Sequence, residues 1–300
     1  MTMSDQQLSF YLAPKNSPQH LDFPAGPMIR QLVSAALRED LGRADITAAE
    51  FVNPERMAKG VYLSREEFVL CGGPILPLVF EIVDLKVKVK LHFPDGKKIE
   101  PDTVIAEAEG AAVSLLAAER VSLNFLQRLC GIASTARSFV EAVRGTRAII
   151  LDTRKTTPGL RALEKYAVRS GGASNHRFGL DDGFLVKENH IVAAGGLDRI
   201  LERLESLDRN LLKVEIEVQT LDQLRMLTDR KVDIVMLDNM PPAQVAEAVR
   251  LVNGRFKLEA SGGITLQNVR SYAETGVDFI SVGALTHSYK SSNISFLLQN

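Results

Sequence analysis

The sequence has little cysteine and no apolar run long enough to span a membrane. Cys71 and Cys130 lie far apart, without metal-ligand spacing and in apolar surroundings, which predicts reduced, buried thiols in a cytoplasmic protein. The longest uncharged run, residues 68–80, is too short to cross a bilayer and contains prolines. The start of the chain has no basic segment followed by an apolar one. We therefore expect no export signal and no membrane partner.

The sequence also lacks an excess of charge of either sign, because 36 lysines and arginines face 37 aspartates and glutamates for a net charge of −1. This balance removes the global field that drives nonspecific binding to nucleic acids, so no nucleic-acid partner is expected and any basic site must be local. What is present is 45% hydrophobic and 24% charged residues in a chain of 300. That composition can bury the core of one large domain or two smaller ones.

The first half of the chain predicts a mixed α/β domain. Residues 1–24 are polar and contain prolines, which is typical of an arm, whereas residues 27–43 carry apolar side chains at helical spacing. Between residues 61 and 104, short β-prone runs alternate with Gly- and Pro-containing turns, which indicates a small sheet. Residues 111–139 are rich in Ala and Leu and predict a long helix that leads into a second domain.

The second half repeats a rhythm of strand, loop and helix. Such βα units argue for a parallel sheet, either in an α/β barrel or in a doubly wound fold. No Gly-x-Gly-x-x-Gly motif opens a helix here, so a dinucleotide site is not favoured. The six expected strands are residues 148–151, 183–186, 213–218, 232–237, 256–260 and 279–282.

Polar residues follow each expected strand, and this pattern favours the barrel. Catalytic groups of α/β barrels gather at the C-terminal ends of the strands, with phosphate sites in the last two strand loops. The residues at these ends are Asp152, Arg154 and Lys155; Lys187 and Asn189; Glu217; Asp238 and Asn239; Ser261, Gly262 and Gly263; and Gly283 and His287.

Five cationic or imidazole side chains come from three loops around one predicted barrel mouth, so the ligand should carry several negative charges. Arginine pairs bidentately with carboxylates and phosphates, whereas lysine acts as a point charge, and a mixture suits a ligand that has both groups. The five residues are Arg154, Lys155, His176, Arg177 and Lys187.

Glu217 and Asp238 would repel such a ligand unless a divalent cation intervened, so we expect Mg²⁺ bound mainly through the substrate. Ser261, Gly262 and Gly263 lead into a helix expected to begin near Thr265, where backbone N–H groups can cradle a phosphate.

Two features have simpler interpretations than a role in the site, and the orientation of a third is left open. Arg161 and Lys165 are expected on a solvated helix face, and His190 is expected to be a hydrogen-bonded loop histidine rather than a ligand. Glu215 and Glu217 face the same way on one strand, but their spacing does not say whether they point into the barrel or away from it.

Long segments of the chain resemble quinolinate phosphoribosyltransferases, in the order that the family has them. They are DTRKTTPGLRALEKYAVRSGG (152–172), SNHRFGL (174–180), LVKENH (185–190), VEIEV (214–218), MLDNM (236–240), LEASGGI (258–264) and ISVGALTHS (280–288), with AAERVSLNFLQRLCGIAS (117–134) and the weaker LREDLGRADIT (37–47) in the first half.

The resemblance implies an α/β chain, with a mixed α/β (α+β sandwich) domain at 25–131 followed by an open (β/α) barrel at 132–288. Residues 289–300 are a candidate to return to the first domain. The implied activity joins quinolinate to phosphoribosyl pyrophosphate with loss of CO2, which is a step of NAD biosynthesis. The implied assembly is a homodimer or a multiple of dimers.

The resemblance also implies roles for single residues. The residues that match the quinolinate lining are Arg120, Arg154, Lys155, His176, Arg177 and Lys187. Of these, Arg120 would act in the partner's site, and Lys155 would also lie near the pyrophosphate. Glu217 and Asp238 match carboxylates near the ribose hydroxyls and Mg²⁺, and, with Lys155, form the expected catalytic set. Ser261, Gly262, Gly263, Gly283 and His287 match phosphate-side loops.

The sequence departs from the family pattern at Ala173, Cys130 and Ser292–Asn293, none of them a charged site position. Two other classes remain open. Lys187, at the end of an apolar strand, could form a Schiff base as in an aldolase-like barrel enzyme, and the glycine loop alone could serve a noncatalytic sensor of phosphorylated metabolites.

Overall fold

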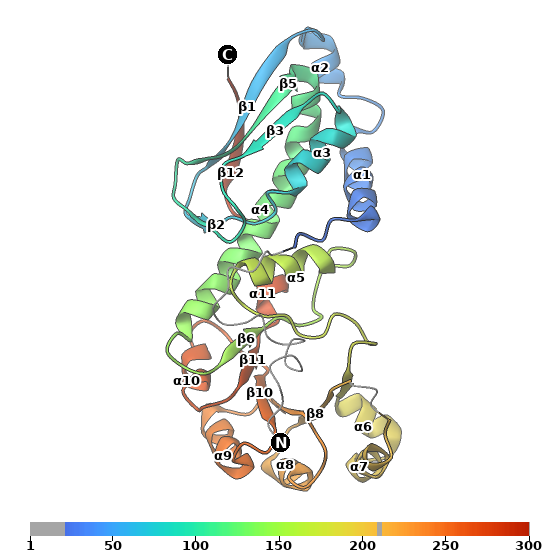
Figure 1. Ribbon diagram of the computed structural model, residues 1–300, viewed down its shortest axis with the longest axis vertical. Coiled ribbons are helices and arrows are strands. Elements are labelled where there is room, and N and C mark those ends of the chain that lie inside the picture. The colour runs from blue at the N-terminus through green and yellow to red at the C-terminus, as the bar shows by residue number, and fades with distance from the viewer. Residues whose placement is uncertain (1–21, 209–211, 300) are drawn as a thin grey trace. The chain divides into compact units, whose positions relative to one another are not determined.

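The computed structural model describes residues 22–208 and 212–299, which form two compact units (Figure 1). We call Ser138–Lys155 with Ala173–Ala284 the barrel unit, and residues 22–137, 156–172 and 285–299 the N-terminal unit. Residues 1–21 of the predicted arm lie outside the described residues. No helix of the described chain has the length and apolar character needed to cross a membrane.

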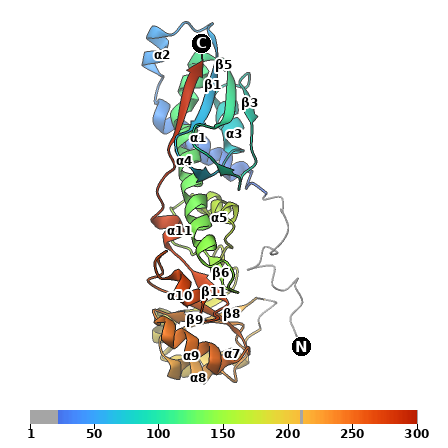
Figure 2. The same cartoon turned by 90° about the vertical axis from the view of Figure 1, so that its left-hand side faces the viewer.

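The N-terminal unit contains a four-stranded antiparallel sheet in the order β12-β1-β5-β3. Its strands are β1 (Met57–Ser64), β3 (Lys88–Leu91), β5 (Val104–Ala111) and β12 (Ile294–Gln299). The C-terminal strand β12 therefore lies beside β1, far from it in sequence (Figure 2). The short strands β2 (Phe68–Val69) and β4 (Lys98–Ile99) pair separately.

Four helices accompany this sheet: α1 (Pro27–Leu41), α2 (Ile46–Phe51), α3 (Ile75–Val83) and the long α4 (Ala112–Ala142), which continues into the barrel unit. The helices predicted at 27–43 and 111–139 are thereby confirmed as α1 and α4. Phe296 of β12 packs against Tyr62 and Phe80, with ring centroids 4.8 and 6.5 Å away. Gly60 is required beneath it, because a Cβ there would overlap the Phe296 ring.

Helix α5 (Arg161–Ser170) belongs to the N-terminal unit, although the sequence-based boundary placed it in the barrel domain. The prediction that Arg161 and Lys165 form a solvated face is wrong. Lys165 is 3% exposed, and Arg161 is half-buried, with Nε donating to Thr156 Oγ1 over 2.9 Å. The reason is that residues 163–168 are all buried, so this helix is covered on most of its sides.

The barrel unit contains a six-stranded parallel sheet, which confirms all six expected strands and their direction. The strands are β6 (Ile149–Leu151), β7 (Phe184–Val186), β8 (Val214–Val218), β9 (Ile234–Asp238), β10 (Lys257–Ser261) and β11 (Phe279–Ser281). Their order, β6-β11-β10-β9-β8-β7, places the first strand beside the last, as in a barrel. Strands β6 and β7 form the two edges, so the barrel is open.

Side chains from separated strands meet inside this curved sheet. Leu151 of β6, Ile234 of β9 and Phe279 of β11 form one buried cluster, packed by Ile149. The barrel-unit helices α8 (Leu221–Leu227), α9 (Pro242–Val252) and α10 (Val269–Ala273) lie on the outer face (Figure 1), with α6 (Glu188–Ala194) and α7 (Leu197–Glu205) following β7. The last short helix is α11 (Ala284–His287).

Candidate active site

Strand β8 settles which way its two glutamates point. Glu215 pairs with Ile234, a member of the buried apolar cluster, and Glu217 pairs with the next residue of the same face, Met236. Both glutamates therefore face the interior, where they are 1% and 8% exposed. Glu259 of β10 pairs with Met236 and is fully buried on the same face.

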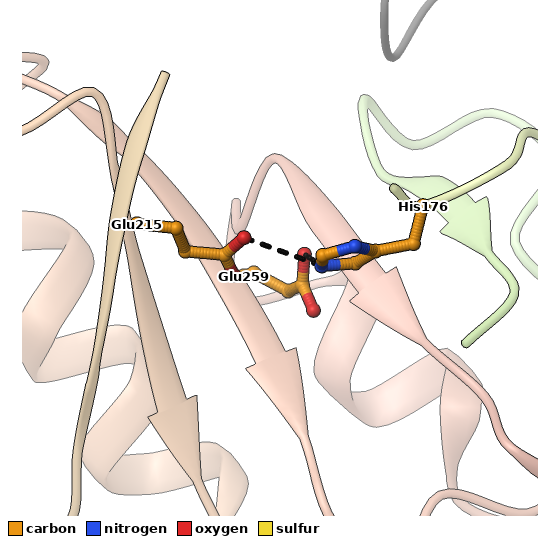
Figure 3. Close-up of side chains that lie close together, drawn as sticks. All are labelled: His176, Glu215 and Glu259. Atoms are coloured by element: carbon orange, nitrogen blue, oxygen red, sulfur yellow. Dashed lines mark ion pairs between the residues drawn. The ribbon is translucent and has the colours of Figure 1, made fainter. Parts of the chain in front are cut away.

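His176 lies between the two deeper glutamates (Figure 3). Its Nε2 is 3.2 Å from Glu215 Oε2 and 3.6 Å from Glu259 Oε2. Its Nδ1 accepts the backbone N–H of Arg177 over 2.8 Å, so the ring proton is on Nε2, directed towards the carboxyl groups. Burial in the barrel raises the pKa of both Glu215 and Glu259 to about 8. We call these three residues the inner cluster of the site.

A buried carboxylate holds the chain around His176. Asp152 follows β6 and is fully buried. Its Oδ1 accepts the His176 backbone N–H and its Oδ2 accepts Asn175 Nδ2, both over 2.7 Å. Arg177, 5% exposed, donates from Nη1 to the Gly183 carbonyl over 2.9 Å. The predicted basic loop is thus fixed to the barrel by buried polar contacts.

Lys187 and Glu217 form the outer part of the site. Lys187 Nζ lies 2.8 Å from Glu217 Oε2, and the Lys187 side chain is 45% exposed. This arrangement disfavours the Schiff-base alternative, because a Schiff base needs a lysine amine that is free to attack a carbonyl carbon, and this amine is held by a carboxylate. His190 is hydrogen-bonded, as expected: its Nδ1 accepts the Lys187 backbone N–H over 2.9 Å and caps α6.

The loop after β6 supplies two more cations. Arg154 is half-buried, and its Nε is buried without a hydrogen-bond partner among residues 22–208 and 212–299. A buried guanidinium N–H of this kind is available to an anionic ligand. Lys155, next in the chain, is exposed.

The loops after β9 and β10 approach each other closely. Asn239 adopts a left-handed backbone (φ 56°) and donates its N–H to the Ser261 carbonyl over 2.8 Å. Gly262 has φ +92°, and a Cβ there would overlap the Asn239 side chain. Gly263 has φ +62° with open space where a side chain would be. Asp238 Oδ2 accepts Asn239 Nδ2 over 2.8 Å.

The helix predicted to begin near Thr265 begins four residues later, as α10 at Val269. Thr265 donates its N–H to Asn268 Oδ1 over 2.8 Å, and Asn268 Nδ2 donates to the Gly263 carbonyl over 2.9 Å. The asparagine side chain thus closes a turn that replaces the first helical turn. Any phosphate at this loop would meet loop backbone rather than a helix terminus.

The predicted site residues do not all fall in one unit. Those of the barrel unit are Arg154, Lys155, His176, Arg177, Lys187, Glu217, Asp238, Ser261, Gly262, Gly263 and Gly283. Arg120 and His287 belong to the N-terminal unit. Arg120 is exposed on α4, and its side chain forms no hydrogen bond or ion pair within the described chain. His287 Nδ1 lies 2.7 Å from Ser288 Oγ.

Sequence reasoning left Glu215 undecided and missed Glu259 and the anchoring role of Asp152. A signal was present, because Glu215 and Glu259 stand inside short apolar strands, VEIEV and KLEAS. Carboxyl groups are rarely fully buried unless they have partners, so an acidic residue within a buried strand indicates a polar cluster.

Fold and site together define an α/β-barrel enzyme whose ligands are anionic. Cations from the loops after β6 and β7, carboxylates on β8 and β9, and a glycine loop after β10 all lie at the carboxyl ends of parallel strands.

The chain belongs to the quinolinate phosphoribosyltransferase family. The family model for the N-terminal domain matches residues 45–130, and the model for the C-terminal domain matches residues 132–297.

Relatives and solved structures agree with this membership. A probable nicotinate-nucleotide pyrophosphorylase (carboxylating) of Bacillus subtilis is 41% identical over 89% of this chain and 92% of its own length. A mitochondrial quinolinate phosphoribosyltransferase (decarboxylating) of Nicotiana tabacum is 38% identical over 91% of this chain and 83% of its own. The solved nicotinate-nucleotide pyrophosphorylase of Francisella tularensis has a TM-score of 0.88 and 38% identity, covering 95% of this chain and all of that one.

Proposed function

We propose that this phosphoribosyltransferase converts quinolinate and phosphoribosyl pyrophosphate into nicotinate mononucleotide, pyrophosphate and CO2, a step of NAD biosynthesis. The names of the relatives include both the nucleotide chemistry and the decarboxylation. The observation that carries the proposal is the set of cations at the barrel mouth, beside two carboxylates and a glycine loop. A dicarboxylate and a pyrophosphate are the kinds of ligand that such a set can neutralise.

Quinolinate would be bound by the basic side chains of the mouth. Arg154 offers a buried guanidinium N–H that lacks a partner in the described structure. Arg177 lies on the loop that is anchored to Asp152, and its guanidinium donates to the Gly183 carbonyl. Lys187 would exchange its contact with Glu217 for a substrate carboxylate. His176 lies in the same lining, and Lys155, being exposed, can also reach the pyrophosphate.

The phosphate groups would lie against the loops after β10 and β11. Ser261, Gly262 and Gly263 present backbone N–H groups, with open space beside Gly263. Gly283 follows β11, and His287, which belongs to the N-terminal unit, is assigned to phosphate binding by the resemblance alone. Positive φ at successive glycines is compatible with an anion-binding turn.

Glu217 and Asp238 fit a Mg²⁺ that is held mainly by substrate and water. Asp238 has one oxygen engaged, by Asn239 Nδ2, whereas Glu217 accepts Lys187 Nζ at Oε2 and, over 3.5 Å, the Glu188 backbone N–H at Oε1. Mg²⁺ commonly binds one or two protein carboxylates together with substrate phosphates and water. When bound, it would neutralise charge on the pyrophosphate leaving group.

The residues would act chiefly by positioning and by electrostatic stabilisation. Loss of pyrophosphate leaves an oxocarbenium-like centre at ribose C1, so the cations must hold the pyridine nitrogen in line with C1 while Lys155 stabilises the leaving group. The glycosylated nitrogen is a pyridinium, whose positive charge stabilises the electron pair left on C2 when the 2-carboxylate leaves as CO2, and C2 then takes up a proton from solvent to give the nicotinate ring. No organic cofactor is required, because the substrate supplies its own electron sink.

We also propose a homodimer, or a multiple of dimers, in which Arg120 acts in the partner's site. Arg120 is exposed and without a partner in the described chain. On the barrel unit, Phe178 and Leu180 are 48% and 71% exposed, which suits a surface covered by a second copy. The free, buried Cys71 and Cys130 suit a reducing compartment such as the cytoplasm.

The proposal is tested by incubating the purified chain with quinolinate, phosphoribosyl pyrophosphate and Mg²⁺. We expect nicotinate mononucleotide and CO2 in equal amounts, and neither product when phosphoribosyl pyrophosphate is omitted. A noncatalytic sensor would bind phosphoribosyl pyrophosphate in calorimetry and release no CO2. That result would exclude the transferase.

A further inference from the structure

Arg128 of helix α4 contacts the chain just beyond the loop that carries Arg154 and Lys155. Its side chain is 25% exposed, and its Nε donates to Glu164 Oε1 over 3.1 Å. Its Nη2 donates to the same oxygen and to the Thr157 hydroxyl. Glu164 lies on α5, which runs beside α4 (Figure 2), and its carboxylate is fully buried.

The Glu164 carboxylate binds the backbone at the same point. Its Oε2 accepts the Thr157 N–H over 3.0 Å, so Thr157 is bound through both its main chain and its side chain. The following turn is closed by the Leu160 N–H, which donates to the Thr157 carbonyl over 3.0 Å. The Thr156 hydroxyl accepts Arg161 Nε over 2.9 Å. Residues of α4 and α5 therefore fix this segment of the chain together.

Asp152 fixes the same loop at its other end. Its buried carboxylate accepts two hydrogen bonds from the basic loop, and its N–H donates to the Ser174 carbonyl over 3.1 Å. Residues 153–156 lie between the two fixed points. A chain spans at most about 3.6 Å per residue, so the Lys155 Cα stays within about 7 Å of the Thr157 Cα.

Arg128 also contacts a second segment of the N-terminal unit. Its Cζ lies 5.1 Å from the centre of the Tyr289 ring, in a cation–π contact. The chain passes from the barrel unit to the N-terminal unit after Lys155 and again after Ala284. One guanidinium therefore contacts both of the segments that follow these crossings.

An ion pair with a buried carboxylate is weak evidence for a contribution to stability. Removing the charges from water is costly, and apolar residues of similar volume are often equally stabilising. What the pair provides is geometry, because a planar guanidinium that binds a carboxylate and a hydroxyl together fixes direction as well as distance.

We propose that Arg128 and Glu164 are positioning residues, which hold the backbone of the loop that carries Arg154 and Lys155 before substrate binds. The proposal rests on the proposed function for the identity of the ligand, quinolinate. Arg128 and Glu164 act through Thr157, so the two cationic side chains begin from a restrained backbone. Groups that are restrained in advance lose less entropy on binding.

Replacing the pair by apolar residues separates positioning from stability. In Arg128→Met/Glu164→Met no buried carboxylate is left unpaired, so the midpoint of thermal unfolding should stay close to that of wild type. The dissociation constant for quinolinate, measured by calorimetry, should rise on the order of tenfold. Arg147→Met breaks an arginine–aspartate pair with Asp278, before β11, and should leave this constant unchanged as the control.

An unchanged dissociation constant in the folded double variant would overturn the proposal. If that variant does not fold, Arg128→Lys serves in its place, because it leaves Glu164 paired but cannot bind Glu164 and Thr157 through one planar group. It should raise the constant several-fold, and a wild-type value would overturn the proposal equally.

A double-mutant cycle tests whether the pair acts through the loop. In an Arg154→Met background, the change at Arg128 and Glu164 should raise the dissociation constant by clearly less than it does in wild type, because one of the restrained cations is gone. Full additivity would show that the pair acts independently of Arg154 and would contradict the proposal.

Amide hydrogen exchange without ligand tests the loop itself. The amides of Arg154 and Lys155 should exchange on the order of tenfold faster in the double variant, whereas those of β9 should not change. Equal exchange in variant and wild type would show that the pair does not restrain the loop. This measurement does not depend on turnover, so a wild-type chain without transferase activity would remove the proposed function and leave the restraint of the loop to be decided by exchange.

Discussion

Lys187 and Glu217 form an ion pair at the mouth of the barrel unit, so at the scale of single residues quinolinate has to compete with a carboxylate of the protein. The Lys187 Nζ lies 2.8 Å from Glu217 Oε2. A substrate displaces this contact only when it offers the Lys187 ammonium a negative group comparable to the Glu217 carboxylate. The requirement favours a ligand with two carboxylates over one with a single carboxylate.

We therefore predict that nicotinate, which lacks the 2-carboxylate, is a very poor substrate. Its kcat/KM should be at least about a hundredfold below that of quinolinate, because cations built to pair with the missing group remain uncompensated. Both reactions form the same mononucleotide, so chromatography of the product compares them directly at one concentration of phosphoribosyl pyrophosphate. Comparable turnover of the two pyridines would contradict the assignment of the basic residues.

Glu259 makes the stability of the protein depend on pH. An unfolded glutamate ionises near pH ~4.3, whereas burial raises the pKa of Glu259 to about 8 in the folded state. Between these values the folded state binds the extra proton, so raising the pH lowers the free energy of unfolding, and this loss levels off above about pH 8. Glu259→Gln removes that titration.

The variant should therefore gain stability relative to wild type as the pH rises through this window, by up to about 1.4 kcal/mol per pH unit. Urea unfolding at several pH values measures the difference, with the exposed Glu274→Gln as the control. A difference that is constant across the window would show that Glu259 is already ionised in the folded protein.

At the scale of elements, hydrophobic pattern was sufficient for the strands of the barrel, since short β-branched runs bounded by loops occur six times at regular spacing. The hydrophobic pattern was insufficient for the start of α10, where a side chain takes the hydrogen bonds that a first helical turn would make. Asn268 closes the 265–268 turn and delays α10, and no periodicity reports such a contact. Lys165 was misassigned for a related reason, because a charged residue suggests solvent exposure and only tertiary packing shows that α5 is covered.

The candidate site was predictable to the extent that it follows from strand order. Residues at successive strand ends have to meet at one mouth, which brought Lys187 and Glu217 together. The inner cluster depends on which face of β8 points inward and on a contact across the barrel from His176, and neither follows from spacing. Arg120 is assigned by resemblance alone and stays a prediction, since an exposed arginine on a helix has no chemical signature of its own.

The loop after β10 allows a matched test of the phosphate site. Gly263 (φ +62°) and Gly254 (φ +79°) both have left-handed backbone and open space where a Cβ would lie. Alanine at either position should cost about 1 kcal/mol of stability from backbone strain. Gly263→Ala should also raise KM for phosphoribosyl pyrophosphate several-fold, because the methyl group occupies the space that the phosphate needs.

Gly254→Ala is the control, because Gly254 follows α9 and is not part of the proposed site. Its KM values should equal those of wild type despite the same loss of stability in thermal unfolding. Equal KM values in both variants would place the phosphate away from Gly263.

At the scale of the whole molecule, the residues that the resemblance assigns to the site belong to two different units. Lys187 belongs to the barrel unit and Arg120 to the N-terminal unit, which the last strand β12 completes by pairing with β1. If Arg120 acts in the partner's site, each active site needs two chains. If Arg120 were a solvent-exposed residue with no role in an active site, its replacement would leave activity unchanged.

We predict that Arg120→Ala and Lys187→Ala are each nearly inactive and that a mixture of the two regains activity. A heterodimer contains one site in which an intact barrel receives an intact arginine, and one site that lacks both. Random reassortment makes about half of the dimers mixed, with one good site in two, so about a quarter of wild-type activity should return. Differently tagged chains verify that subunits have exchanged before the assay. If purified heterodimers remain as inactive as the parent variants, Arg120 does not complete a partner's site.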